Sequence, residues 1–167
     1  DELKAVALET PKRAAAKMDK LRVADAISEV FTLLRRCNKY IDETEPWVLA
    51  KDEAKKDRLA TVLYNLMEGI RIAAICLEAF LPETSEKILN QLNTKERDFE
   101  KLDTFGRLET GMKVIEKPEI LFARLDVKEV LEKVEAMQAA AAPKEEEPVI
   151  DIEPKAEITF DDFEKLQ

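Results

Sequence analysis

Apolar residues recur three and four positions apart along most of residues 1–93, and this spacing constrains the fold more than any other feature. Such spacing places apolar side chains on one face of an α-helix. Two long stripes carry the pattern: Val23, Ile27, Val30, Leu34, Cys37 and Ile41 in residues 20–42, and Leu59, Val62, Leu66, Ile70, Ala73, Leu77 and Phe80 in residues 52–81. From Ile70 onward the second stripe is apolar almost all round, so we expect it at the centre of a helical bundle.

Shorter helical patterns flank the two long stripes. Residues 2–19 carry one of them, in which Pro11 either kinks a single helix or opens a second one. Residues 83–93 and 126–141 carry two more, and Asp126 suits the N-cap of the last helix. Because the chain starts inside a helical pattern and without Met, we expect a piece of a longer protein.

Composition shifts divide the chain into four parts. Residues 1–93 are expected to form the bundle, and residues 94–141 an irregular segment and a final helix packed on it. Within 94–125, "MKVIEK" and "EILFARL" alternate weakly, which indicates short strands. Residues 142–157 form an acidic, proline-rich linker with too little apolar surface to fold, and 158–167 begin a truncated second domain. The fold class is therefore all-α, with a short irregular or β segment and a disordered linker.

Charge is distributed unevenly along the chain. The net charge is −9, yet residues 1–81 balance 14 basic against 14 acidic side chains, and residues 143–167 carry 3 against 9. A pI near 4.8 argues against a non-specific nucleic-acid binder but leaves room for a local site in the neutral half. No apolar run approaches the ~20 residues of a membrane span.

Catalytic and metal-binding patterns are missing from the sequence. The chain has no histidine, which removes Ser-His and Cys-His schemes and the usual zinc sites. Its two cysteines, Cys37 and Cys76, lie on apolar stripes and are expected to be reduced core thiols of a cytoplasmic protein. "GRLETGMK" at 106–113 approaches a phosphate loop, but Met112 stands where lysine is required. We therefore expect turn glycines there, and no catalytic or metal site in this chain.

The only tryptophan, Trp47, stands at the break between the two long stripes. Glu45 precedes a proline and is expected to be extended, whereas Pro46 suits the first turn of a short helix. Three basic side chains lie within eleven residues of the indole along the sequence: Arg36, Lys39 and Lys51. A rigid indole beside cations is a platform on which an unstacked base gains about 1–3 kcal/mol. The alternative is a core aromatic that plugs the end of the bundle.

Three stretches together resemble one family. "RRCNKYIDETEPWVLAKD" resembles the signature N-[KR]-Y-[IV]-D-x-x-x-P-W of the anticodon-binding domain of methionyl-tRNA synthetases. "GMKVIEKPEILFARLD" is similar to the family's passage after the bundle, where the family usually has proline at the position of Ala123. "EITFDDFEKLQ" resembles the start of the C-terminal tRNA-binding domain that many bacterial members carry. The resemblance covers nearly the whole chain, in order.

The resemblance implies a parent enzyme that activates methionine with ATP and Mg and transfers it to tRNA(Met). Its catalytic domain, and an earlier helix that contacts anticodon bases, would lie upstream of Asp1. The domain would read the CAU anticodon through a candidate set of six residues: Trp47, Pro46, Asn38, Asp42, Lys39 and Arg36. For Asn38 and Asp42 the alternative role is helix-end capping and turn hydrogen bonds. Expected partners are tRNA(Met), the parent's catalytic domain and a second copy held through the missing C-terminal domain, with no membrane.

A function of another class remains open from the sequence. The excess of acidic residues after Ala142 also suits a non-enzymatic helical module that recruits a basic partner through its tail. In that case Trp47 would be buried in the core, so the exposure of its ring discriminates between the two hypotheses.

Overall fold

The computed structural model describes residues 2–141 and 159–160. Contacts divide the chain into two compact units, Asp1–Ala123 and Arg124–Gln167, which are described separately. The expected linker at 142–157 lies outside the described residues, as does the expected domain start at 158–167 except for Thr159 and Phe160.

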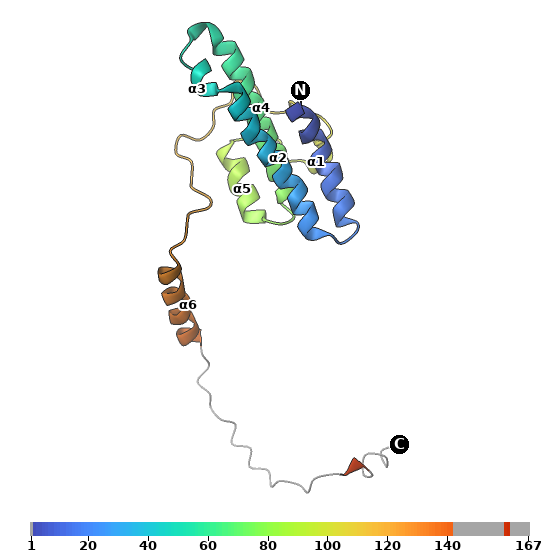
Figure 1. Ribbon diagram of the computed structural model, residues 1–167, viewed down its shortest axis with the longest axis vertical. Helices are drawn as coiled ribbons and strands as arrows, with labels where there is room; N and C mark the ends of the chain where they lie inside the picture. The colour runs from blue at the N-terminus through green and yellow to red at the C-terminus, as the bar shows by residue number, and fades with distance from the viewer. Residues whose placement is uncertain (1, 142–158, 161–167) are drawn as a thin grey trace. The chain divides into compact units, whose positions relative to one another are not determined.

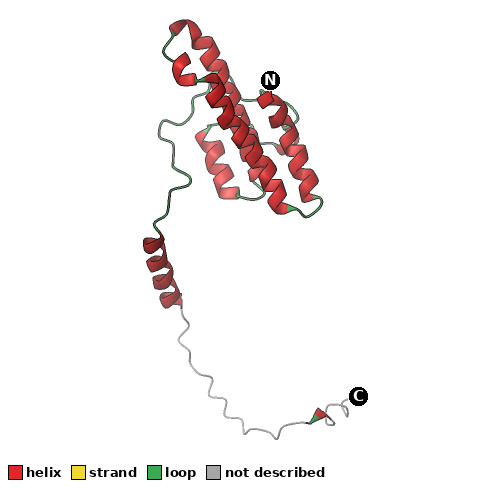
Figure 2. Cartoon of the chain, in the orientation of Figure 1, coloured by secondary structure: helices red, strands yellow, loops and turns green. Residues whose placement is uncertain are grey.

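The first unit is helical (Figures 1 and 2). Its α-helices are α1 (Glu2–Met18), α2 (Val23–Thr44), α3 (Pro46–Leu49), α4 (Lys56–Leu77) and α5 (Pro82–Gln91), with 3-10 turns η1 (Glu53–Lys55) and η2 (Phe99–Lys101). α1 and α2 are joined by a short turn and run antiparallel, and α4 packs against both. Pro11 lies inside the continuous helix α1, which decides for a single helix at that position. The all-α prediction is confirmed.

The core centres on the second half of α4. Every residue from Arg71 to Leu77 is buried, which confirms the expected central helix. On α2 the buried side chains are Ala26, Val30, Leu33, Arg36, Cys37 and Tyr40. This face is shifted by about one position from the expected stripe, and Val23 is 46% exposed. The shift arises because α1 and α4 both cover α2, and periodicity alone does not say which edge of a stripe the neighbours cover.

A buried ion pair fastens the segment after α5 to the bundle. Arg71 donates from Nε and Nη2 to the carboxylate of Glu68 at 3.0 and 2.6 Å, and both side chains are fully buried. The backbone N–H groups of Gly106, Arg107 and Leu108 also donate to this carboxylate, at 3.0, 3.1 and 3.3 Å. Burial raises the pKa of Glu68, but the hydrogen bonds from Arg71, Arg107 and Gly106 outweigh burial and leave the pKa below its ordinary value. We call this arrangement the Glu68 clasp.

The segment after α5 forms no strand in any described residue, so the strand prediction is wrong. Beyond the clasp, two amide side chains at and just after the end of α5 hold the later part of the segment. Gln91 Nε2 donates to the carbonyl of Glu119 at 3.1 Å, and Asn93 Nδ2 to that of Lys113 at 3.1 Å. One backbone bond joins them, from Ile115 N–H to the Gln91 carbonyl at 3.2 Å. A strand needs a row of backbone hydrogen bonds to a partner strand, and donation from two side-chain amides does not supply it.

The second unit contains α6 (Val127–Ala141). The Asp126 carboxylate accepts from the N–H groups of Lys128 and Glu129 at 2.9 and 3.3 Å, which confirms the expected N-cap. The expected packing of this helix on the bundle stays a prediction.

One helical stretch, Glu53–Leu77, is long and apolar enough to cross a membrane by length and composition alone. In its most apolar window 56% of the residues are buried inside the protein, which is also typical of the core helix of a bundle.

Candidate nucleic-acid interface at the Trp47 corner

Glu45 joins α2 to α3 in a left-handed conformation, with φ 43° and ψ 59°. The expected extended conformation before proline is therefore wrong. The reason is that Glu45 ends one helix and starts the next. Its N–H donates to the Ile41 carbonyl at 2.9 Å, and its own carbonyl accepts from Val48 and Leu49 N–H at 2.8 and 3.2 Å. These bonds hold a conformation that costs a non-glycine residue about 1–2 kcal/mol.

Pro46 occupies the first turn of α3, as expected. Its missing N–H has no intrahelical partner to lose there, and its ring fixes φ for the helix. On the other side of the corner, Asp52 accepts from the Ala54 N–H at 3.1 Å and starts η1, which leads into α4. Leu49 packs against the bundle core. The corner is thus braced at both ends, so a side chain on it is held with little further loss of entropy.

The Trp47 indole is 51% exposed. This confirms that the ring is open to solvent and contradicts its alternative role as a plug of the core. The neighbouring Val48 is also exposed, whereas Leu49 points inward. Figure 1 shows α3 at one end of the bundle, beside the end of α2. An exposed aromatic ring on a braced backbone can accept the flat face of a base.

The basic side chains near the corner differ in their surroundings. Arg36 is only 9% exposed, and its Nη2 donates to Glu43 at 2.8 Å and pairs with Glu2 at 3.2 Å. Its guanidinium also lies 5.9 Å from the centre of the Tyr40 ring. Because its charge is committed inside the protein, we remove Arg36 from the proposed contacts. The exposed Lys39 is 3.7 Å from Glu43, a separation at which a surface pair holds weakly.

Asn38 and Asp42 are exposed on α2. Within the described residues neither side chain has a hydrogen-bond or ion-pair partner, so the capping alternative finds no support. The end of α2 is instead satisfied by Thr44, whose hydroxyl donates to the Tyr40 carbonyl at 2.6 Å. Lys51, four residues after Trp47, is exposed and likewise unpaired among the described residues. The structure thus leaves Asn38, Asp42 and Lys51 available to a ligand.

Neither cysteine is a nucleophile. Cys37 and Cys76 are free and buried, as expected. Burial raises the pKa of Cys37 to about 11 and that of Cys76 to about 12, so both thiols are protonated near neutral pH. Among residues 2–141 and 159–160, no group of three or more His, Cys, Asp or Glu side chains is arranged to hold a metal ion.

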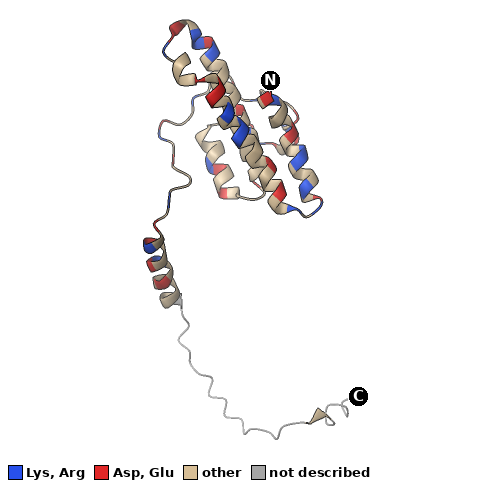
Figure 3. Cartoon of the chain, in the orientation of Figure 1, with Lys and Arg blue, Asp and Glu red and all other residues tan. Residues whose placement is uncertain are grey.

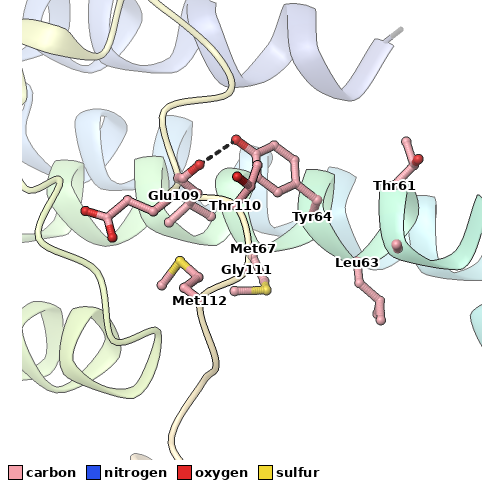
Figure 4. A pocket seen from close by; sticks show the side chains of 10 residues that line it. Thr61, Leu63, Tyr64, Met67, Glu109, Thr110, Gly111 and Met112 are labelled. Atoms are coloured by element: carbon pink, nitrogen blue, oxygen red, sulfur yellow. Dashed lines mark hydrogen bonds between the residues drawn. The ribbon is translucent and has the colours of Figure 1, made fainter. Parts of the chain in front are cut away.

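A hollow of about 490 Å³ lies between α4 and the loop that approaches a phosphate-loop pattern (Figure 4). Tyr64 donates from its hydroxyl to the Leu108 carbonyl at 2.9 Å and closes one side. The lining contains no Lys or Arg. Gly106 and Gly111 have φ of 91° and 80°, the left-handed region that favours glycine. This confirms that they are turn glycines, and the lining supplies no cation for a phosphate.

The bundle and its corner define an all-α domain with an open aromatic platform, the class to which helical anticodon-binding domains belong. Residues 2–142 match the family model described as the anticodon binding domain of methionyl tRNA ligase. The chain therefore belongs to this family.

Relatives and solved structures agree with this assignment. The chain is 46% identical to the methionine–tRNA ligase of Clostridium perfringens over 99% of its own length and 26% of that protein's. It is 44% identical to the ligase of Clostridium tetani over 99% of this chain and 25% of the relative. Mycobacterium tuberculosis methionyl-tRNA synthetase bound by methionyl-adenylate matches with a TM-score of 0.58 and 31% identity, over 62% of this chain and 21% of that one. The chain thus spans about a quarter of the length of these curated relatives.

Proposed function

We propose that this chain is the anticodon-recognition part of a cytoplasmic methionine–tRNA ligase, and that its RNA partner is tRNA(Met). Family membership and 46% identity to a curated ligase support this role. Because the chain spans about a quarter of that relative, methionine activation with ATP and Mg belongs to the remainder of the parent. Dimerisation through a further C-terminal domain, and the absence of a membrane partner, are parts of the same proposal.

The observation that carries the proposal is the half-exposed Trp47 ring on a braced corner. Trp47 stacks on an anticodon base, and Pro46 sets the direction of the indole. Asn38 and Asp42 supply base-edge hydrogen-bonding groups from the exposed side of α2. Lys39 adds positive charge for the neighbouring phosphates. Arg36 acts indirectly, because its ion pair with Glu2 links α2 to the start of α1.

The test is Trp47→Ala in the intact ligase that contains this chain. Loss of one stacking contact worth about 1–3 kcal/mol should weaken tRNA binding about 5- to 150-fold. Charging of tRNA at low tRNA concentration should fall accordingly, whereas methionine activation by ATP should not change. Trp47→Phe should retain part of the affinity because a smaller aromatic face remains.

Phe99→Ala is the matched control, because Phe99 is an aromatic of the same exposure, 51%, outside the corner. It should leave tRNA affinity unchanged. Unaltered charging by Trp47→Ala, or an equal loss in Phe99→Ala, would remove Trp47 from the site. The alternative of an acidic-tail module is not favoured, since the family match accounts for the helical domain and Trp47 is not buried.

A further inference from the structure

The end of the bundle formed by the α1–α2 turn is strongly basic. Residues 12–22 contain five Lys or Arg side chains against one Asp, in a chain whose net charge is −9. Figure 3 shows the blue segments along the second half of α1 and at the turn that follows. The anticodon proposal uses none of these residues, which lie at the opposite end of α2 from the Trp47 corner.

Four of these basic side chains line a hollow of about 360 Å³. Its lining residues are Arg13, Ala16, Lys17, Lys20, Arg22 and Glu29. Arg13 lies 3.7 Å from Glu9, and Arg22 pairs with Asp25, but both pairs are exposed and so neutralise little. Lys17 and Lys20 have no ion-pair partner in the part of the chain that the structure describes. The lining therefore carries four basic side chains against one acidic side chain, Glu29, and this excess of positive charge suits a phosphodiester group.

The turn that carries these cations is closed by a complete set of helix-end hydrogen bonds. The N–H of Arg22 donates to the Lys17 carbonyl at 3.0 Å, and that of Leu21 to the Met18 carbonyl at 2.8 Å. Leu21 occupies the left-handed position of this motif with φ 56° and is 88% exposed. A fixed backbone places Lys17, Lys20 and Arg22 around one point before any ligand arrives, which lowers the entropic cost of binding.

The length of α2 sets the distance between this hollow and the Trp47 corner. α2 has 22 residues, so it spans about 33 Å at a rise of about 1.5 Å per residue. A single-stranded loop seated at Trp47 is too short to occupy both ends. The double-stranded stem that leads away from such a loop can lie along α2 and bring its backbone to the other end. Lysine and arginine contact that backbone without reading sequence.

We propose that the hollow at the α1–α2 turn binds backbone phosphates of the RNA stem whose loop is read at Trp47. The proposal rests on the anticodon-binding function and adds a second, sequence-independent contact to it. Lys17 and Lys20 each neutralise a phosphate, and Arg13 and Arg22 line the same hollow. A protein partner at this end of the bundle would instead pack against the exposed Leu21, so a variant of Leu21 distinguishes the two kinds of partner.

The test compares Lys17→Gln/Lys20→Gln with Lys128→Gln/Lys133→Gln, which removes the same charge from exposed positions on α6. The probes are a methionine tRNA transcript and a single-stranded oligonucleotide of its anticodon loop, titrated against the full chain at several salt concentrations. Each lost phosphate contact should reduce the slope of log K against log salt by about 0.7–0.9. At 0.1 M salt the first double variant should bind the transcript about tenfold or more weakly, and the oligonucleotide as the unaltered chain does.

The outcomes separate this inference from the function on which it rests. If Trp47→Ala weakens both probes while Lys17→Gln/Lys20→Gln changes neither, the stem contact is overturned and anticodon recognition stands. If Trp47→Ala changes neither probe while the lysine variant still weakens the transcript, the phosphate site stands and the loop contact fails. Leu21→Gly should leave transcript binding unchanged. A loss in Leu21→Gly as large as in the lysine variant would overturn the phosphate assignment in favour of an apolar contact.

Discussion

At the scale of single residues, the Trp47 corner depends on the left-handed conformation of Glu45. A glutamate at φ 43° is disfavoured by its Cβ, and only the hydrogen bonds of two helix ends keep it there. Such local strain is typical of functional sites, where the surrounding structure determines the backbone, and here it lies next to the proposed base-stacking residue Trp47. The Glu45 side chain itself forms no hydrogen bond or ion pair among the described residues, so its identity can be changed without disturbing contacts.

We predict that Glu45→Gly stabilises the chain by about 1 kcal/mol, because glycine has no Cβ to clash in the left-handed region. Urea unfolding monitored by circular dichroism measures the change. Asn93→Gly is the control: Asn93 has a similar φ of 55°, but asparagine tolerates this region, so its gain should be smaller. A Glu45→Gly variant less stable than the parent chain would show that the glutamate side chain, rather than the backbone, holds the corner.

At the level of elements, α2 and α4 lie close together at Gly69. A Cβ built at Gly69 would lie 2.8 Å from Sγ of Cys37 and 3.8 Å from Cδ1 of Leu3. The first distance is shorter than any ordinary contact, so the glycine sets how near the two helices lie. The lack of space explains why glycine occupies the middle of a long helix, although glycine there reduces helix stability by about 1 kcal/mol relative to alanine.

Gly69→Ala should therefore destabilise the chain despite the better helix propensity of alanine. Overpacking a filled core costs about 1–3 kcal/mol, which exceeds the propensity gain of about 1 kcal/mol. Cys37→Ala removes the obstructing sulfur, so Gly69→Ala should cost less in that background. A double-mutant cycle by urea unfolding measures the coupling. Strictly additive effects would contradict a clash between these two positions.

At the scale of the whole first unit, the Glu68 clasp joins the middle of α4 to a loop about forty residues later. The pKa of the Glu68 carboxyl group lies below its ordinary value of 4.5, so Glu68 binds a proton more readily in the unfolded chain than in the folded one. The stabilisation is then fully present above about pH 4.5 and is lost as the pH falls through the folded-state pKa. The clasp therefore makes the stability of this unit sensitive to acid.

Glu68→Gln should lower the free energy of unfolding near pH 7 by about 3–5 kcal/mol, because Arg71 is left as a buried charge without its partner. The variant should also lose part of the dependence of stability on pH below about pH 4.5, since its amide does not titrate. Thermal or urea unfolding, repeated between about pH 3 and pH 7 in steps of ~1 pH unit, measures both effects. Parallel pH profiles for variant and parent would show that Glu68 does not carry this acid sensitivity.

The long helices, one helix cap and the start of the short helix at Pro46 were predictable from local sequence patterns. The periodicity that places α2 and α4, the N-cap at Asp126 and the opening of α3 at Pro46 depend on residues within a few positions of each other. The physical reason is that helical hydrogen bonds and caps close over four residues or fewer. The exposure of Trp47 was left open by the sequence, which also allowed a core aromatic, and the 51% exposure of the ring is a finding of the structure.

Features that depend on residues distant in the sequence could not be predicted from local patterns. The tertiary structure buried Arg36 between Glu2 and Glu43, and turned α2 by about one position in its packing. It also closed the Glu68 clasp on a loop 38 to 40 residues away, a contact for which the sequence offers no local pattern. Burial and ion pairing are set by whichever side chains the fold brings within a few ångströms, and spacing along one helix does not contain that information.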